Sequence, residues 1–487
     1  MKSETKKVHF IGICGVAMSA VATALWQKGW KVTGSDAGFF PPVSTHLKNV
    51  GIPYYSGWHP EKMVEGGAPD LVIVGNAIGS TNPEFVYVKE NKIPFKSYPE
   101  IVGDVIVQNH SIVCAGTWGK TTSSALLAHI LKHANLHPSY MIGGLTQDES
   151  PAAVIDSGDW SVVEGDEYKT AKWDSEAKFF HYKPTHLLLT AVSWDHADMY
   201  PTEESYFEAF EKLLKMIPEN GKIVVCADNK SARKVAFGNF QNSPNQMEAQ
   251  TVENSQMLLP PRVTYGKNPE ATYRYENIVQ SAEGISFDID YHGKKYQITS
   301  PLLGTYNAEN ITGCFAMAKE IGIAPGDITD AIKNFHGMKR RLEKRYEHGV
   351  TVIDDIAHSP EKAKSVLKNL REIYKGKIIA VYEPNSGNRT YESIPSYENA
   401  FMDADEVIIP RLTKLKIDGE NPQKTFDGAE LRQIISKTQK NVSYMDEDEK
   451  LVEEITKNAG ANDCIVFLGS HGFRGMIEDT VEHLAKI

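Results

Sequence analysis

The segment Gly116-Thr-Trp-Gly-Lys-Thr-Thr122 has the residue types and spacing of a loop that holds nucleotide phosphates. In such a loop, backbone N–H groups and a helix N-terminus surround the phosphates, a lysine reaches the outer ones, and a hydroxyl binds Mg²⁺. Lys120 and Thr121 would play the last two parts. The full pattern G-x-x-x-x-G-K-[ST] needs a glycine where this chain has Cys114. An ordinary strand–turn–helix corner is therefore the alternative interpretation.

Two later apolar segments end in side chains that could bind a metal ion. Residues 159–167 read as a strand that ends in three carboxylates, and residues 185–196 as a strand that ends in Asp195 and His196. The carboxyl ends of parallel strands lie at one edge of a sheet, so Glu164 and His196 would lie near Thr121. Together they would hold a metal that bridges a phosphate and a second substrate. Taken singly, such an acid is more often solvated and such a histidine more often structural.

The N-terminal segment has a second strand–glycine–helix pattern. Residues 8–18 read as a strand, a glycine turn and a helix start, and the strand at 31–36 places Asp36 where a ribose-binding acid would sit. The pattern G-x-G-x-x-G is poorly matched, because Cys14 and Ala17 replace two of its glycines. A phosphate-containing ligand other than NAD is therefore favoured. The end of the strand at 70–78 carries Asn76, which would be either a ligand-binding residue or a turn residue.

The elements that must position these residues follow an α/β order. The first domain is expected to close near Asn109, and alternating apolar residues at 272–299 predict an antiparallel β insertion in the second. Strands at 350–355, 377–382, 406–409 and 463–469 give a third unit its own α/β rhythm. The predicted fold is α/β with three domains: a Rossmann-like domain (1–109), a central P-loop ATPase-type domain (110–344) and a Rossmann-like C-terminal domain (345–487).

Length and charge limit the classes of protein. The 487 residues suffice for three domains of about 150 residues each. A net charge of −11 argues against nucleic-acid or anionic-membrane partners. The five cysteines are far apart and show neither zinc spacing nor a disulfide framework, which indicates a reducing compartment. The N-terminus lacks a signal-peptide core and no apolar span of membrane length follows, so we expect a cytoplasmic protein without a membrane anchor.

Further polar residues lie where later elements begin or end. Asn307 and Asn310 are three apart on a predicted helix and would read a base edge, although Asn307 also suits a helix cap. Residues 339–345 contain five cations in seven positions. Such a run is usually a solvated face, but at a predicted domain junction a guanidinium would reach the outer phosphate. Strand ends of the third unit carry Asp355, His358, residues 383–388, Ser470 and His471.

In this order, the segments resemble the Mur ligases, the ATP-dependent amino-acid and peptide ligases of bacterial cell-wall precursors. Gly116–Thr122 resembles the phosphate loop of that family. Its later motifs resemble Glu164-Gly-Asp-Glu167, Asp195-His196, Asn307 with Asn310, Arg340-Arg341 and residues 354–358. The resemblance covers essentially the whole chain. It implies ATP and Mg²⁺ as cofactors and UDP-N-acetylmuramate as a substrate.

The resemblance also implies roles for matching residues. The catalytic residues would be Lys120, Glu164, His196 and Arg341, and the metal ligands Thr121, Glu164 and His196. ATP would be bound by Gly116, Thr117, Gly119, Lys120, Thr121, Thr122, Asn307, Asn310, Arg340, Arg341 and Asp355. The UDP-sugar would be bound by Gly12, Ile13, Cys14, Gly15, Met18, Ser35, Asp36 and Asn76. The peptide side would be lined by His358, Asn385 and Ser386.

Two branches of the family differ in the amine that they use. Residues 12–15, 34–45, 166–171 and 178–184 resemble murein peptide ligase, which attaches L-alanyl-γ-D-glutamyl-meso-diaminopimelate to UDP-N-acetylmuramate. The alternative is UDP-N-acetylmuramate–L-alanine ligase. The chain departs from both at Trp118 and Tyr306, where histidine is typical, and at Ser359, which replaces a second histidine. Asn385 stands where an arginine that reads a peptide carboxylate is common.

The implied reaction passes through an acyl phosphate of the lactyl carboxylate, which the amine of an L-alanyl peptide then attacks. The partners would be these small molecules, and the protein a monomer or weak homodimer. Two other classes stay open: a nicotinamide-dependent oxidoreductase, given the Rossmann-like start, and a P-loop regulatory ATPase without ligation chemistry.

Overall fold

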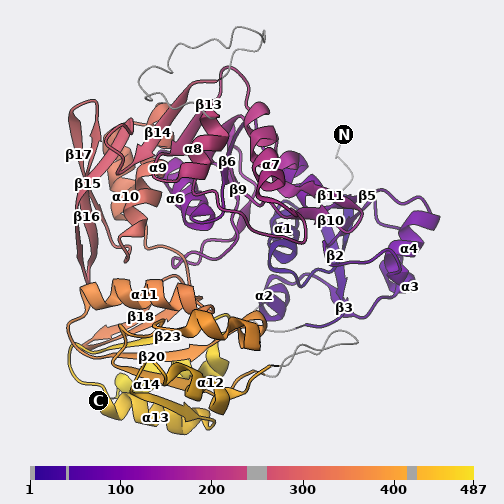
Figure 1. Cartoon of the computed structure of the whole chain (residues 1–487). Helices are drawn as coiled ribbons and strands as arrows, with labels where there is room; N and C mark the ends of the chain where they lie inside the picture. Colours follow the sequence, from indigo (N-terminus) through magenta and orange to yellow (C-terminus); the bar gives the residue numbers. More distant parts are fainter. Residues whose placement is uncertain (1–5, 40–42, 239–259, 414–424, 487) are drawn as a thin grey trace. The chain divides into compact units, whose positions relative to one another are not determined.

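The computed structural model describes residues 6–39, 43–238, 260–413 and 425–486 (Figure 1). The chain divides into two compact units. The first contains residues 1–277, 287–299 and 308–335, and the second contains residues 278–286, 300–307 and 336–487. The elements build three α/β sheets, two of them mainly in the first unit and one in the second. The predicted three-domain α/β class is therefore confirmed.

The N-terminal sheet has five parallel strands in the order β3-β2-β1-β4-β5. This order is that of a doubly wound Rossmann-type half, in which ligands bind beyond the carboxyl ends of the strands. The apolar strand β1 is buried almost throughout, because helices cover both faces of such a sheet. The elements are β1 (Lys7–Ile11), α1 (Val16–Gln27), β2 (Lys31–Asp36), α2 (Val43–Val50), β3 (Tyr54–Ser56), α3 (Pro60–Met63), β4 (Leu71–Val74), α4 (Pro83–Glu90), β5 (Phe95–Ser97) and α5 (Tyr98–Val105).

The central sheet has the order β17-β16-β15-β14-β13-β12-β6-β9-β7-β8. Its middle is parallel, and β6 lies between β12 and β9. Its strands are β6 (His110–Ala115), β7 (Ser139–Met141), β8 (Ala153–Val154), β9 (Trp160–Gly165), β12 (His186–Leu189), β13 (Lys222–Cys226), β14 (Arg262–Gly266), β15 (Tyr273–Ser281), β16 (Gly284–Tyr291) and β17 (Lys294–Ser300). Two-residue connections join β15, β16 and β17, a length that only hairpins use, as expected for the predicted β insertion.

A small hairpin and several helices complete the described part of the central region. The hairpin consists of β10 (Lys169–Ala171) and β11 (Asp174–Ala177). The helices are η1 (Lys178–Tyr182), α6 (Lys120–His133), α7 (Glu203–Lys215), α8 (Lys230–Phe237), α9 (Tyr306–Glu320) and α10 (Pro325–Lys333). One hydrophobic cluster contains side chains of both the N-terminal and the central sheets, among them Phe10, Val21, Val113 and Leu189.

The C-terminal sheet has the order β18-β19-β23-β20-β21-β22 and is parallel except for β18. The strands are β18 (Glu343–His348), β19 (Val350–Asp355), β20 (Ile378–Glu383), β21 (Glu406–Pro410), β22 (Val442–Met445) and β23 (Cys464–Gly469). The helices are α11 (Pro360–Ile373), η3 (Ser386–Arg389), η4 (Tyr391–Tyr397), α12 (Gly428–Ile435), α13 (Asp448–Asn458), η5 (Phe473–Gly475) and α14 (Met476–Leu484).

Part of the cationic segment 339–345 belongs to strand β18. Lys344 and Arg345 belong to this edge strand, whose sequence is EKRYEH. Charged side chains are common on edge strands, because they discourage pairing with another chain. Within the described ranges, no helix has the length and apolarity that a bilayer crossing requires.

Candidate active site

The segment between β6 and α6 forms a tight loop around two glycines. Gly116 and Gly119 have φ angles of +133° and +85°, a region that other residues rarely adopt. A Cβ atom on Gly116 would lie 2.2 Å from the hydroxyl of Thr190, and one on Gly119 would lie 2.5 Å from Oδ1 of Asn310. The Thr190 hydroxyl also lies 2.6 Å from the carbonyl oxygen of Trp118. The loop is therefore closely packed in a single conformation, as a phosphate cradle requires.

Lys120 is the first residue of α6, and its ammonium group has a carboxylate partner. Its Nζ donates to the carbonyl oxygen of Gly116 at 2.5 Å and to Glu167 Oε2 at 2.9 Å. The Lys120 side chain is 14% exposed and that of Glu167 only 2%. Glu167 lies just beyond the end of β9, where the sequence pattern does not distinguish it from the other two carboxylates.

Thr121 and Glu164 bring two oxygen ligands together beside the loop. Thr121 Oγ1 donates to Glu164 Oε1 at 2.8 Å, and the backbone N–H of Gly143 donates to Glu164 Oε2 at 2.6 Å. The parallel register aligns Glu164 of β9 with Cys114 of β6, which brings the ends of the two strands to the same edge. Hydroxyl and carboxylate oxygens are the ligands that Mg²⁺ prefers.

His196 lies nearer to a different carboxylate from the one that the sequence suggested. Its Nε2 is 3.8 Å from Oε1 of Glu167, and its ring packs against that of Tyr168 with centroids 4.9 Å apart. Within the described ranges, no three His, Cys, Asp or Glu side chains gather as a metal cluster. Magnesium sites for nucleotides typically combine one or two carboxylates with phosphate oxygens. Thr121 and Glu164 fit such a partial set.

Two of the proposed ATP-binding residues act within the protein framework. The Thr117 hydroxyl donates to the carbonyl oxygen of Ser193 at 2.8 Å and lies 3.0 Å from the Tyr206 hydroxyl. Asn307 donates from Nδ2 to the carbonyl oxygen of Leu303 at 2.8 Å. Thr122 and Arg341 are at least partly exposed, whereas Asn310 is buried against Gly119.

The glycine turn of the N-terminal domain is held by the backbone of β2. Gly12 and Ile13 both donate their backbone N–H to the carbonyl oxygen of Ser35, at 2.8 and 3.0 Å. The backbone N–H of Cys14 donates to Asp36 Oδ2 at 2.8 Å. Burial, and next the charge of Asp36, raise the pKa of the Cys14 thiol to about 11. Gly15 is the exposed N-cap of α1.

Three side chains that were expected at the UDP-sugar are buried. Ile13 and Met18 belong to the hydrophobic core, with 0% and 5% exposure. The hydroxyl of Ser35 is also buried and donates to Glu84 Oε2 at 2.5 Å. Apolar packing takes up Ile13 and Met18, and Glu84 takes up the Ser35 hydroxyl, so their place at the UDP-sugar stays a prediction. Residues 40–42 of the segment 34–45 lie outside the described residues.

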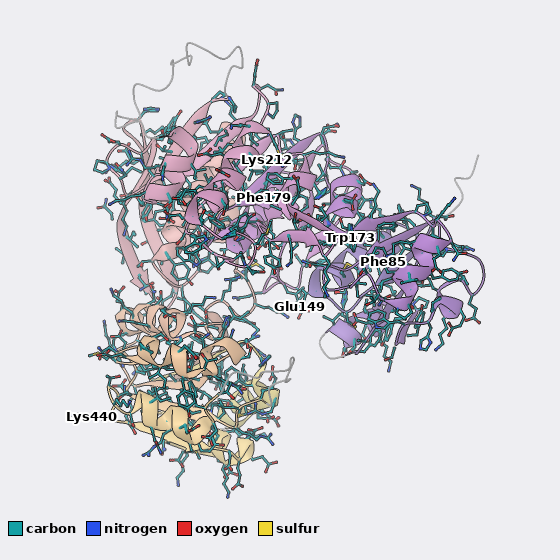
Figure 2. The ribbon with its side chains drawn as sticks, turned by 45° about the vertical axis from the view of Figure 1, so that its right-hand side comes forward. Phe85, Glu149, Trp173, Phe179, Lys212 and Lys440 are labelled. Carbon is teal, nitrogen blue, oxygen red and sulfur yellow. The ribbon has the colours of Figure 1, made fainter. Side chains whose placement is uncertain are left out.

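The β10–β11 hairpin of the central region contacts the N-terminal domain. Trp173, in its turn, packs against Phe85 of α4 with ring centroids 4.9 Å apart (Figure 2). Asn76, beyond the end of β4, donates from Nδ2 to the carbonyl oxygen of Lys169 at 3.1 Å. Asn76 thus ties the carboxyl edge of the first sheet to the hairpin that follows Glu167.

In the second unit, Arg340 has an extensive set of internal partners. Its guanidinium donates to the carbonyl oxygens of Gly469, Ser470 and His471 at 2.6–2.9 Å, and its Nε donates to Asp354 at 3.3 Å. Burial, partly offset by Arg340, raises the pKa of Asp354 to about 6. Arg340 therefore fixes the loop after β23.

Asp355 also has a positioning role in the second unit. Its carboxylate accepts the backbone N–H groups of Leu342 and Ala357 at 2.8 and 2.9 Å. Burial raises its pKa. It therefore connects the segment that carries Arg341 to the one that carries His358.

His358 follows in the half-buried turn before α11. Its Nδ1 lies 2.7 Å from the carbonyl oxygen of Ile356, so Nδ1 carries the proton and Nε2 is the basic nitrogen. Burial, together with Lys362 and Arg340, lowers its pKa. Asn385 caps η3 by accepting the backbone N–H of Asn388 at 3.2 Å, and the adjacent Ser386 is exposed.

Sequence models of three Mur ligase domains match successive parts of the chain. The Mur ligase family catalytic domain matches residues 7–110, the middle domain residues 114–318, and the glutamate ligase domain residues 340–471. A UDP-N-acetylmuramate–L-alanine ligase from Anaeromyxobacter is 31% identical over 430 residues, which are 86% of this chain and 85% of the relative. The chain belongs to the Mur ligase family, whose members are ATP-dependent ligases that form amide bonds.

Other relatives and solved structures cover nearly the same length. A UDP-N-acetylmuramate–L-alanine ligase from Bartonella tribocorum is 29% identical over 95% of this chain and 93% of its own. The structure of UDP-N-acetylmuramate–alanine ligase from Thermotoga maritima aligns with a TM-score of 0.77 at 23% identity, over 99% of both chains. That of a murein peptide ligase from Psychrobacter arcticus aligns at 0.66 and 24%, also over 99% of both. A Neisseria ligase for UDP-N-acetylmuramate and L-alanyl-γ-D-glutamyl-meso-diaminopimelate is 26% identical, with a TM-score of 0.59, over 69% of this chain and 100% of its own.

Proposed function

We propose that the protein uses ATP to join the lactyl carboxylate of UDP-N-acetylmuramate to the amine of L-alanine. The observation that carries the proposal is the phosphate loop, in which Lys120 begins α6 and Thr121 meets Glu164 at 2.8 Å. Family membership and the L-alanine ligases among its relatives support the choice of substrates. On this proposal, residues 1–109 bind the nucleotide sugar, residues 110–344 bind ATP, and residues 345–487 bind the amine.

The chemistry has two steps. A carboxylate oxygen of the sugar attacks the γ-phosphorus of ATP, which forms an acyl phosphate and releases ADP. The amine then attacks the acyl carbon, the amide bond forms, and inorganic phosphate leaves. The amine loses a proton in this second step. The phosphorylation is needed because a carboxylate lacks a good leaving group.

The residues around the phosphate loop would offset the electrostatic repulsion between ATP and the carboxylate of the nucleotide sugar. Lys120 and the N-terminus of α6 offer positive charge to the phosphates. Thr121, Glu164 and His196 are the proposed ligands of Mg²⁺, which when bound would neutralise phosphate charge. Arg341 is the proposed guanidinium for the outer phosphate.

On the amine side, His358 has the chemistry of a proton acceptor. Its basic Nε2 and its lowered pKa keep it neutral at physiological pH. The five free cysteines support a reducing, cytoplasmic setting for the reaction.

The murein tripeptide is the second candidate for the amine. Residues 166–171 and 178–184 favour it, and so does the likeness to the Neisseria ligase at 26% identity. The curated relatives instead carry the name of the L-alanine ligase, which places L-alanine first. In both candidates the attacking group is the α-amine of L-alanine, so the chemistry at the amine is the same.

The test is release of inorganic phosphate from ATP with UDP-N-acetylmuramate and either L-alanine or the tripeptide. We expect turnover with L-alanine and none without the nucleotide sugar. Turnover with the tripeptide but not with L-alanine would make the tripeptide the substrate in place of L-alanine. ATP hydrolysis that ignores both the sugar and the amine would contradict the proposed ligase reaction.

A further inference from the structure

Glu167 forms a buried ion pair with the lysine of the phosphate loop. Lys120 Nζ lies 2.9 Å from Glu167 Oε2 and 3.2 Å from Oε1, so both carboxylate oxygens are within hydrogen-bond distance. The same ammonium group donates to the carbonyl oxygen of Gly116 at 2.5 Å. The positive charge of Lys120 is thus already neutralised by a protein group.

The structure around Glu167 holds its carboxylate in place. The Tyr206 hydroxyl donates to Glu167 Oε1 at 3.3 Å, and the Tyr200 hydroxyl donates to the carbonyl oxygen of Glu167 at 2.7 Å. Tyr206 also lies 3.0 Å from the hydroxyl of Thr117, a residue of the phosphate loop. Glu167 is therefore fixed relative to the loop on both its backbone and its side chain.

A lysine with these partners cannot at the same time direct its charge at a phosphate. Its three N–H groups face the Glu167 carboxylate and carbonyl oxygens of the loop, those of Gly116 at 2.5 Å and Thr117 at 3.5 Å. Ion pairs that are withdrawn from water are strongly coupled, so removing one partner changes what the other can bind.

We infer that Glu167 is a positioning residue that competes with nucleotide phosphates for Lys120. When a phosphate takes the ammonium group, the carboxylate must give it up. Glu167 would then set how tightly the loop holds ATP and how readily it releases ADP after turnover. This inference rests on the proposed function, because it assigns the loop to ATP.

The carboxylate of Glu167 also lies near His196, the proposed magnesium ligand. His196 Nε2 lies 3.8 Å from Glu167 Oε1, on the side of the carboxylate that Tyr206 also contacts.

The test is the dissociation constant of ADP, measured by calorimetry on the full chain. Glu167→Gln keeps the size of the side chain and removes its charge, so it should bind ADP about tenfold more tightly. Glu167→Asp keeps the charge but shortens the reach, so it should tighten binding by less; it serves if the glutamine variant fails to fold. A purely structural role would weaken binding or leave it unchanged, and either result would overturn the inference.

Two controls locate the effect at Lys120. Glu176→Gln removes the same charge from an exposed ion pair with Lys212, at 2.7 Å, and should leave ADP binding unchanged. In a Lys120→Ala background, Glu167→Gln should no longer tighten binding. Tightening that persists there, or that also appears in Glu176→Gln, would show a general charge effect and overturn the inference. If Lys120→Ala alone did not weaken ADP binding, the proposed function would fail instead.

Discussion

The first unit contains two strand–glycine–helix loops that differ in how they can hold a phosphate. The loop between β6 and α6 has Lys120 at the helix start, with Thr121 and Glu164 paired beside it. The loop between β1 and α1 has no charged side chain from Gly12 to Met18, and its nearby acid, Asp36, accepts the backbone N–H of Cys14. The first loop supplies charge for phosphoryl transfer, whereas the second offers only backbone groups and a helix N-terminus.

The contrast shows that one local fold can serve two tasks. Binding a diphosphate requires backbone N–H groups and a helix N-terminus, which both loops can supply. Phosphoryl transfer also requires groups that stabilise charge in the transition state. We therefore propose that the first domain holds the nucleotide sugar and the central domain performs the chemistry.

The largest expected effect comes from removing the charge of the phosphate loop. Lys120→Ala should lower kcat by about 10³-fold, since preorganised charge is a large term in phosphoryl transfer. Phosphate release with both substrates present measures it. Lys212→Ala is the control, because it removes the same charge from an exposed ion pair with Glu176. If Lys120→Ala kept a kcat within tenfold of the wild type, the assignment of phosphoryl transfer to the β6–α6 loop would be contradicted.

Acid pH should destabilise the central sheet through its buried histidine, His186. Burial, and next His110 and Lys222, lower the pKa of His186 in the central sheet to about 4. A histidine in an unfolded chain has a pKa of about 6.5, so the unfolded state binds the proton more strongly. The stability that neutral His186 confers is present above pH 6.5 and is lost as pH falls towards 4, by about 2 kcal/mol at pH 5.

Thermal unfolding between pH 7.5 and 5 measures this difference. His186→Gln should show a smaller loss of Tm on acidification than the wild type. His133→Gln, which changes an exposed histidine of α6, should behave like the wild type. An equal loss of Tm in all three proteins would show that His186 is not a source of acid sensitivity.

A smaller effect should come from strain in the N-terminal loop. Gly12 has a φ of +89°, and Gly12→Ala would place a side chain in a conformation that costs about 1–2 kcal/mol. The dissociation constant of UDP-N-acetylmuramate should rise about tenfold, with that of ADP unchanged. Gly29→Ala is the matched control, because Gly29 has a φ of +84° at the other end of α1 and nothing within 4 Å of the added Cβ. Equal effects of both changes would indicate general destabilisation rather than a binding loop.

Local patterns were enough to predict much of the fold. The strand expected at 31–36 is β2, and a helix, α6, follows the predicted phosphate loop and begins at Lys120. Helical spacing could also have placed Met18 in the core, because Met18, Val21, Ala22 and Leu25 are i, i+3, i+4 and i+7 on α1. The burial of the Ser35 hydroxyl could not be predicted from local spacing, because its partner Glu84 is 49 residues away in the sequence.

The candidate site was predicted where its residues belong to one local motif. The loop glycines, Lys120 and Thr121 follow from spacing alone. Glu167 was not singled out, because its contact with Lys120 joins residues 47 apart and depends on how the chain turns after β9. Arg340 was expected at the phosphates, but its carbonyl partners are about 130 residues further along the chain. Neither the local motifs nor these long-range contacts identify the amine substrate.

The most direct test of the division between the loops is a crossed binding measurement by calorimetry, with ADP and UDP-N-acetylmuramate as ligands. Lys120→Ala should weaken ADP binding at least tenfold and change the dissociation constant of UDP-N-acetylmuramate less than twofold. Gly12→Ala should do the reverse. Loss of UDP-N-acetylmuramate binding in Lys120→Ala, with ADP binding retained, would contradict the assignment of the two loops.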